Sequence, residues 1–207
     1  MDFGGGYGRL SGLILNYAQQ VILADSSTKQ LRFGKELYKN DQRISFQLVT
    51  KKDSIPADNK ALDLLLMIRV SHHIQFPGAI FKEINRVLKP GGLAIVEIAS
   101  EAHFVNRLRY LIKFKAIPKT PTPIGRNSNG QVEQTPFFNH HPETIEQLFK
   151  SANFNIIQKL SVSNFRSQKL KQTVPKKLLL NMENRSQKPL ALINFGPSIF
   201  YLVEKKA

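Results

Sequence analysis

The 207-residue sequence contains no cysteine and no tryptophan. Without cysteine, the chain can form neither disulfides nor thiolate metal sites. No apolar run approaches the roughly 20 residues of a membrane-spanning helix, and no charged, apolar leader opens the chain. Since 42% of the residues are hydrophobic, the chain can bury a core. We therefore expect one domain in the cytoplasm.

Acidic residues are also scarce, with 15 against 30 basic residues and a net charge of +15. The imbalance is uneven, because residues 101–207 hold 17 of the basic and only 6 of the acidic residues. Such a surface suits nucleic acid, an anionic membrane surface (a peripheral contact) or an acidic substrate. A solvated basic surface without a partner is the alternative.

Glycine is concentrated at the start of the chain. Asp2, Gly4, Gly6 and Gly8 alternate as D-x-G-x-G-x-G. Glycine reaches backbone angles that other residues avoid, and a glycine-rich loop between a strand and a helix is where α/β sheets bind nucleotides. The spacing differs from the dinucleotide pattern G-x-G-x-x-G, so a turn without a ligand is the alternative.

The apolar periodicity predicts alternating strands and helices. Such alternation predicts a doubly wound, mostly parallel α/β sheet with helices on both faces. Strands are expected at 21–25, 44–50, 62–70, 93–99, 154–162 and 199–204. Helices are expected at 9–19, 26–40, 76–88, 102–116, 142–152 and, as a short piece, 175–184, with an irregular loop at 117–135.

Four motifs in order resemble the class I S-adenosylmethionine-dependent methyltransferases, in particular the branch that acts on small molecules and lipids. They are the glycine loop, Asp25 after a buried strand, Leu62–Ile74, and the turn Leu88-Lys89-Pro90-Gly91-Gly92. The resemblance implies one Rossmann-like domain over residues 1–207, with a seven-stranded sheet whose last strand is antiparallel. It also implies acceptor-side or lid insertions at about 101–141 and 164–195. Only Met1–Phe3 precede the loop, whereas a buried strand has about 5 residues, so we expect a truncated N-terminus.

The same resemblance implies S-adenosyl-L-methionine as cofactor and assigns roles by position. Gly4, Gly6 and Gly8 would wrap its methionine and ribose parts, and Asp2 would attract its amino or sulfonium end. Asp25 would accept hydrogen bonds from the ribose hydroxyls.

Three further residues are expected at the rim of the cofactor site. Ser26 follows Asp25, and Arg69 ends a strand that faces the cofactor crevice. Lys51 occupies the position where similar enzymes carry an acid for adenine, and nearby Asp53 is expected to substitute for that acid.

Two histidine pairs are candidates on the acceptor side. His72 or His73 could take a proton from an acceptor hydroxyl or amine, although a packing or helix-start histidine is the alternative. His140 and His141 precede a helix, where they would suit acceptor binding or lid closure. No carboxylate cluster supports a metal site.

The predicted function is methyl transfer from S-adenosylmethionine to a small-molecule or lipid-like acceptor. The alternatives are an RNA methyltransferase, suggested by the basic C-terminal half, and a truncated relative without catalysis. In the helix expected at 102–116, one face is apolar and basic residues lie largely off it, so it would touch a membrane, cover the site or pack on the domain. Its apolar face consists of Phe104, Val105, Leu108, Leu111 and Ile112.

Overall fold

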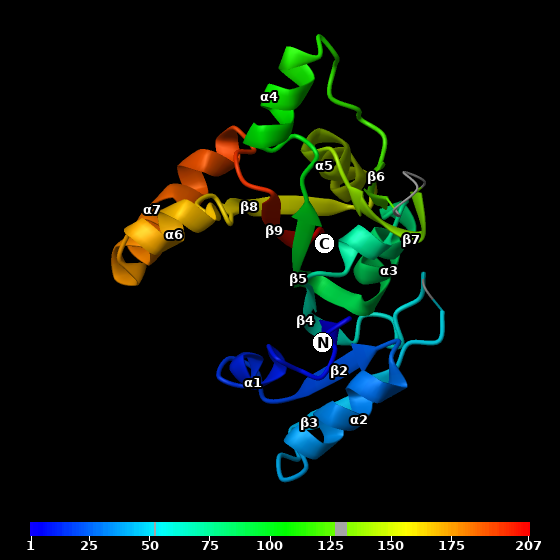
Figure 1. The fold of residues 1–207 in the computed structure, drawn as a ribbon. Helices are drawn as coiled ribbons and strands as arrows, with labels where there is room; N and C mark the ends of the chain where they lie inside the picture. Colours follow the sequence, from blue (N-terminus) through cyan, green and yellow to red (C-terminus); the bar gives the residue numbers. More distant parts are fainter. Residues whose placement is uncertain (52, 127–131) are drawn as a thin grey trace.

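The computed structural model describes residues 1–51, 53–126 and 132–207. Its centre is a seven-stranded sheet in the order β3-β2-β1-β4-β5-β9-β8 (Figure 1). The strands are β1 (Asp2–Phe3), β2 (Val21–Asp25), β3 (Ile44–Leu48), β4 (Leu62–Met67), β5 (Leu88–Ala99), β8 (Phe154–Val162) and β9 (Ser198–Lys205).

The strand directions confirm the predicted fold class. Strands β3, β2, β1, β4 and β5 are parallel neighbours, whereas β9 runs antiparallel to both β5 and β8. The chain moves outward from β1 to β3 and then crosses back to β4 beside β1. In such sheets, ligands bind at the carboxyl ends of the strands where this reversal occurs. The fold therefore places a binding crevice after β1 and β4.

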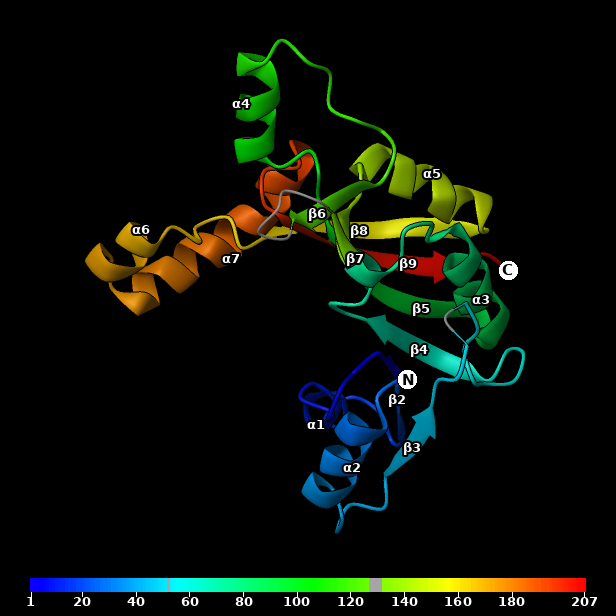
Figure 2. The same cartoon turned by 45° about the vertical axis from the view of Figure 1, so that its right-hand side comes forward.

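Helices cover both faces of the sheet. Helices α3 (Gly78–Val87) and α5 (Pro142–Ser151) bury their apolar stripes on one face, where the rings of Phe81 and Phe149 stack at 4.3 Å. Helices α1 (Ser11–Ile14) and α2 (Thr28–Leu37) pack on the other face against Leu23. Because side chains alternate along each strand, β2 contributes Ala24 to the first core and Leu23 to the second. Figure 2 shows the two helix layers on either side of the sheet.

Two local predictions near the site differ in extent from the structure. The helix expected at 9–19 is regular only over Ser11–Ile14, because glycines lie before it and within it and weaken helical structure. The strand expected at 62–70 ends at Met67, since Arg69 has a left-handed backbone (φ 60°) and a 3-10 turn, η1, follows over Ser71–His73.

The prediction of an irregular loop at 117–135 was wrong for residues 122–126 and 132–135, whereas residues 117–121 are irregular as expected. The segment forms much of a two-stranded antiparallel hairpin, β6 (Thr122–Arg126) with β7 (Val132–Asn139). Its prolines suggested a loop, but proline is tolerated where a strand has a free edge. Residues 127–131 lie outside the described residues.

A helical arm connects β8 to β9. It consists of α6 (Gln168–Thr173), which was not predicted, and α7 (Lys176–Leu192), which is longer than the expected 175–184. At the base of the arm, the Glu183 carboxylate accepts hydrogen bonds from the backbone N–H of Asn164 and Phe165. Figure 2 shows the arm and α4 (Phe104–Ile112) extending away from the sheet.

Candidate active site

The glycine loop after β1 adopts the conformation that its alternation predicts. Gly4, Gly6 and Gly8 have φ angles of 71°, 62° and 88°, in the left-handed region that side chains disfavour. At the start of the loop, the backbone N–H of Gly4 donates a hydrogen bond to the Ala24 carbonyl of β2 at 2.7 Å. The loop therefore turns tightly over the carboxyl end of β2.

The loop is tightly packed at Gly4 but has open space beside Gly6. A Cβ atom at Gly4 would lie 2.2 Å from Val70 Cγ2, so the loop touches the segment after β4. A Cβ atom at Gly6 would meet nothing closer than Gln30 Oε1 at 3.8 Å. The loop is thus closed toward β4 and open at Gly6, where a ligand can approach the main chain.

Asp25 connects the end of β2 to this loop. Its Oδ2 accepts a hydrogen bond from the Gly6 N–H at 2.8 Å, and its Oδ1 accepts one from the Ser27 N–H at 2.8 Å. A carboxylate has about four lone-pair positions, so each oxygen can accept one more hydrogen bond. The structure thus brings together the predicted ribose acid and the predicted glycines, at the open side of the loop.

Asp2 lies beneath the loop, where it is buried with 2% exposure. The Ser11 hydroxyl donates to Asp2 Oδ2 at 2.8 Å, and a Cβ atom at Gly5 would lie 2.6 Å from Asp2 Cγ. Burial raises the pKa of the Asp2 carboxyl, while the Ser11 hydrogen bond opposes that shift. Asp2 therefore supports the loop from below, and its contact with a cofactor stays a prediction.

The three residues expected at the rim are all exposed at the same end of the sheet. Ser26 does not cap α2, because Ser27 Oγ accepts the Gln30 N–H at 3.3 Å. The Arg69 backbone N–H donates to Glu97 Oε2 at 3.0 Å, and Asp53 lies in the connection from β3 to β4. Their roles toward a cofactor stay predictions.

The first histidine pair lies in η1, after β4. The rings of His72 and His73 are 4.2 Å apart, and each lies 5.0 Å from the ring of Phe137 in β7. Burial, followed by the charges of His73 and Arg69, lowers the pKa of His72 to about 4, and burial also lowers the pKa of His73. Both rings are therefore neutral at pH 7, so each has one unprotonated ring nitrogen, although His72 is a weak base.

The second histidine pair lies where β7 meets the sheet. The buried ring of His140 lies with Nε2 3.2 Å from the Ser71 carbonyl oxygen, and its backbone N–H donates to the Ala99 carbonyl at 2.8 Å. His140 thereby joins the hairpin to η1 and β5. His141 is the N-cap residue of α5, and its Nδ1 is buried without a hydrogen-bond partner among the described residues.

A polar cluster that sequence reasoning missed lies after β5. The Glu101 side chain is 3% exposed and accepts hydrogen bonds from the Tyr110 hydroxyl at 2.8 Å and from Asn139 Nδ2 at 2.9 Å. Burial, followed by Glu101, raises the pKa of Tyr110 to about 12. An acid two residues after the end of a predicted strand was the available signal. The cluster fixes both α4 and β7 at the carboxyl end of the sheet.

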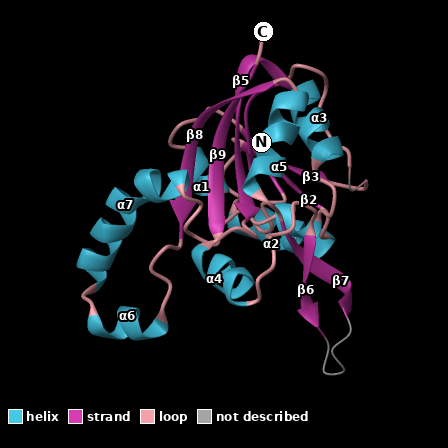
Figure 3. Ribbon diagram, turned by 90° about the horizontal axis from the view of Figure 1, so that it is seen from above, coloured by secondary structure: helices cyan, strands magenta, loops and turns pink. Residues whose placement is uncertain are grey.

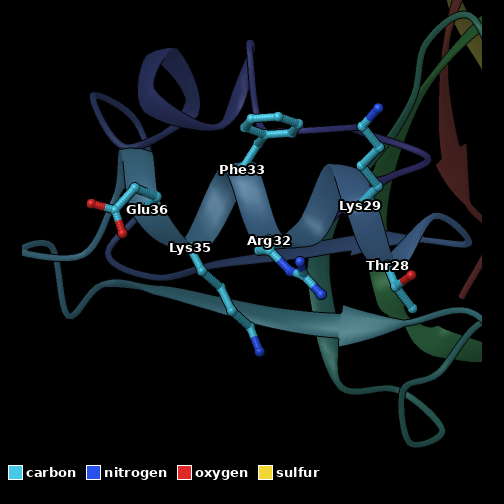
Figure 4. A pocket seen from close by; sticks show the side chains of 6 residues that line it. All are labelled: Thr28, Lys29, Arg32, Phe33, Lys35 and Glu36. Carbon is cyan, nitrogen blue, oxygen red and sulfur yellow. The ribbon is translucent and has the colours of Figure 1, made fainter.

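Of two surface pockets, one lies near the candidate acceptor side and the other lies along α2. One of about 340 Å³ lies between the start of α3 and α5 and is lined by His140, His141 and Phe76, among others. Another of about 700 Å³ follows the outer side of α2, and all of its lining residues come from that helix (Figure 4). Only the first hollow includes residues of the predicted acceptor side.

Within residues 1–51, 53–126 and 132–207, no three His, Asp or Glu side chains are placed to hold a metal ion. In the same ranges, no helix is both long and apolar enough to cross a membrane.

The strand order, the antiparallel β9 and the glycine loop bound to Asp25 define a Rossmann-like methyltransferase fold. Solved structures share it. A SAM-dependent methyltransferase from Methanosarcina mazei matches with a TM-score of 0.67 and 16% identity, over 99% of this chain and 91% of that protein. An S-adenosylmethionine-dependent methyltransferase from Mesorhizobium loti matches with a TM-score of 0.63 and 14% identity, over 99% and 89%.

Sequence comparison points to the same family. Residues 1–96 match the methyltransferase domain family. A ubiquinone/menaquinone biosynthesis C-methyltransferase from Shewanella oneidensis is 25% identical over 163 residues, which are 74% of this chain and 65% of that relative. The match thus spans slightly less than two thirds of the relative's length. The chain is therefore similar to S-adenosylmethionine-dependent methyltransferases in sequence over residues 1–96 and in fold over nearly its whole length.

Proposed function

We propose that this protein transfers a methyl group from S-adenosylmethionine to a small-molecule or lipid-like acceptor. The observation that carries the proposal is the contact of Asp25 with the Gly6 N–H, at the open side of a loop with three left-handed glycines. This arrangement offers a carboxylate for the ribose hydroxyls and bare main chain for the methionine part.

The chemistry requires little covalent assistance from the protein. When bound, S-adenosylmethionine would supply a methyl group activated by its positive sulfonium, so that the acceptor would form a bond to the methyl group as the sulfur–methyl bond breaks and a neutral thioether leaves. The chain must therefore hold the acceptor in line with the methyl group and exclude water. In this proposal, the hairpin that His140 and Glu101 attach to the sheet covers the acceptor side, and neutral His72 or His73 accepts a proton from the acceptor.

Two observations support a small acceptor. The Shewanella relative is named for carbon methylation in ubiquinone and menaquinone biosynthesis, which points to a carbon atom of a small molecule. The 340 Å³ hollow beside His141 is lined by Phe76, Ile145 and Leu148, so it has room for an apolar group.

The experiment is calorimetric titration of the chain with S-adenosylmethionine and S-adenosylhomocysteine. Asp25→Ala should abolish binding, whereas Asp58→Ala, which removes an exposed acid from the β3–β4 connection, should leave it unchanged. Ligand at about 100 times its dissociation constant should also stabilise the fold by ~2.7 kcal/mol. Failure of a folded wild-type chain to bind either compound would refute the proposal. Binding without methyl transfer to any acceptor would instead favour a non-catalytic relative.

A further inference from the structure

Helix α4 exposes its apolar face and buries a polar residue, the reverse of an ordinary surface helix. Its buried residue is the polar Asn106, whereas Leu111 and Ile112 are 70% and 68% exposed, and Phe114 just beyond the helix is 97% exposed. A helix at a protein surface normally turns its apolar stripe to the core. In α4, that stripe faces outward.

Hydrogen bonds hold the helix in this orientation. Asn106 Nδ2 donates to the Glu101 carbonyl at 3.2 Å, Tyr110 donates to the Glu101 carboxylate, and Arg107 Nε donates to the Ala102 carbonyl at 2.7 Å. Turning the apolar stripe inward would break these bonds and leave the buried carboxylate with fewer partners, which is costly. These hydrogen bonds therefore hold the helix with its apolar face outward.

The apolar surface continues onto the end of the arm. Phe104 stacks on Phe195 with ring centroids 5.0 Å apart, and its backbone N–H donates to the Phe195 carbonyl. Shortly before Phe195, Leu192 and Ile193 are 85% and 50% exposed. We call this the α4–α7 surface. It comprises Phe104, Val105, Leu108, Leu111, Ile112, Phe114, Leu192 and Ile193.

Basic side chains lie close in sequence to the residues of the α4–α7 surface. Arg109, Lys113 and Lys115 are exposed on and just after α4, and Lys188 is exposed on α7. This half of the chain holds 17 basic and 6 acidic residues. Apolar side chains with neighbouring cations are the pattern of a helix that lies in the interface of an anionic membrane.

The surface also lies at the end of the sheet that carries the candidate active site. Helix α4 follows the carboxyl end of β5, and the arm follows the carboxyl end of β8. Figure 3 shows α4, α6 and the β6–β7 hairpin at the same end of the sheet. A membrane on this surface would therefore adjoin the acceptor side.

We propose that the α4–α7 surface docks this protein onto an anionic lipid bilayer. Aliphatic side chains gain from the acyl boundary but offer nothing to the phosphates of RNA, and a second copy of the chain would bring the same positive charge. The docking itself requires no bound cofactor. Its role in presenting a lipid-like acceptor rests on the proposed function.

Co-sedimentation with vesicles tests the proposal. Vesicles of phosphatidylcholine alone are compared with vesicles that contain added phosphatidylglycerol, at low and high salt. Wild type should bind the anionic vesicles more tightly, and salt should weaken that binding. The double variant Leu111→Glu/Ile112→Glu should bind about tenfold more weakly or worse.

A matched control comes from α2, on the other face of the sheet. There, Phe33 and Leu37 are 57% and 58% exposed, so Phe33→Glu/Leu37→Glu adds the same charge at similar exposure. This control should bind vesicles like wild type. Circular dichroism verifies that both variants remain folded.

Three outcomes would overturn the proposal. The first is wild-type protein that binds neither kind of vesicle. The second is equal loss of binding in both double variants, which would show a general charge effect. The third is self-association or RNA binding that the α4 variant abolishes while vesicle binding is unaffected. Titration with S-adenosylmethionine is independent of all three, so failure of docking leaves the proposed function standing.

Discussion

A methyl group at Gly4 should collide with the segment after β4. Gly4 and Gly6 have similar left-handed φ angles, 71° and 62°, so an alanine at either position bears a similar backbone strain of ~1–2 kcal/mol. The two sites differ in space, because the new Cβ would lie 2.2 Å from Val70 Cγ2 at Gly4 but 3.8 Å from its nearest neighbour at Gly6. The comparison isolates the steric contribution.

The size of that contribution follows from the overlap. Overpacking a well-packed site typically costs about 1–3 kcal/mol, so Gly4→Ala should lower the free energy of unfolding by ~2–5 kcal/mol in total. Gly6→Ala should lower it by only ~1–2 kcal/mol. For a chain of this length, a difference of about 1 kcal/mol moves the melting temperature by roughly 2–4 °C, so the two variants are readily separated.

Removing the colliding methyl groups should rescue Gly4→Ala. In the double variant Gly4→Ala/Val70→Ala, the nearest atom becomes the Val70 Cβ at 3.4 Å, which is ordinary contact distance. Urea unfolding of the two single variants and the double variant forms a cycle, in which the double variant should be more stable than additivity predicts by ~1–3 kcal/mol. Additive effects, or equal losses at Gly4 and Gly6, would refute the close contact of the glycine loop with Val70.

Three further predictions concern the site. Gly6→Ala should leave the chain folded yet weaken S-adenosylmethionine binding by roughly tenfold or more, because the methyl group occupies the open side of the loop; calorimetry measures this, and unchanged affinity would place the cofactor elsewhere. The pKa of His72 is depressed to about 4, below about 6.5 in the unfolded chain. The unfolded state therefore binds more protons between these values, and stability should fall as the pH drops through this window, with a shallower slope for His72→Gln in urea unfolding at several pH values. In Glu101→Gln, the side-chain NH2 group would face one of the two donors, Tyr110 or Asn139. The substitution should lower the free energy of unfolding by ~1–3 kcal/mol and lower the hydrogen-exchange protection of β7. Unchanged protection would show that the cluster does not hold the hairpin.

Much of the fold could be predicted because the required signals are local. The alternating glycines at the start of the chain predict left-handed backbone angles, since only glycine adopts these angles freely. The run of apolar strands and amphipathic helices indicated a doubly wound sheet. The sequence also placed Asp25 at the end of β2, whereas its role toward ribose stays a prediction. In these cases, a few neighbouring residues carry the whole physical cause.

The remaining features depend on contacts between distant residues. Asp2 is buried because the glycine loop folds over it, and the ring of His140 approaches the Ser71 carbonyl 69 residues away. The hairpin after α4 forms although its prolines suggested a loop. None of these features has a signature within a short window of sequence.

Helix α4 shows most clearly which features follow from local sequence and which depend on tertiary contacts. The sequence by itself determined that the segment is an amphipathic helix with one apolar face, because the spacing of its side chains requires only helical geometry. Which face turns inward was decided by the tertiary structure. There the buried Glu101 carboxylate accepts a hydrogen bond from the Tyr110 hydroxyl, and turning the apolar stripe inward would take that donor away from a buried charge.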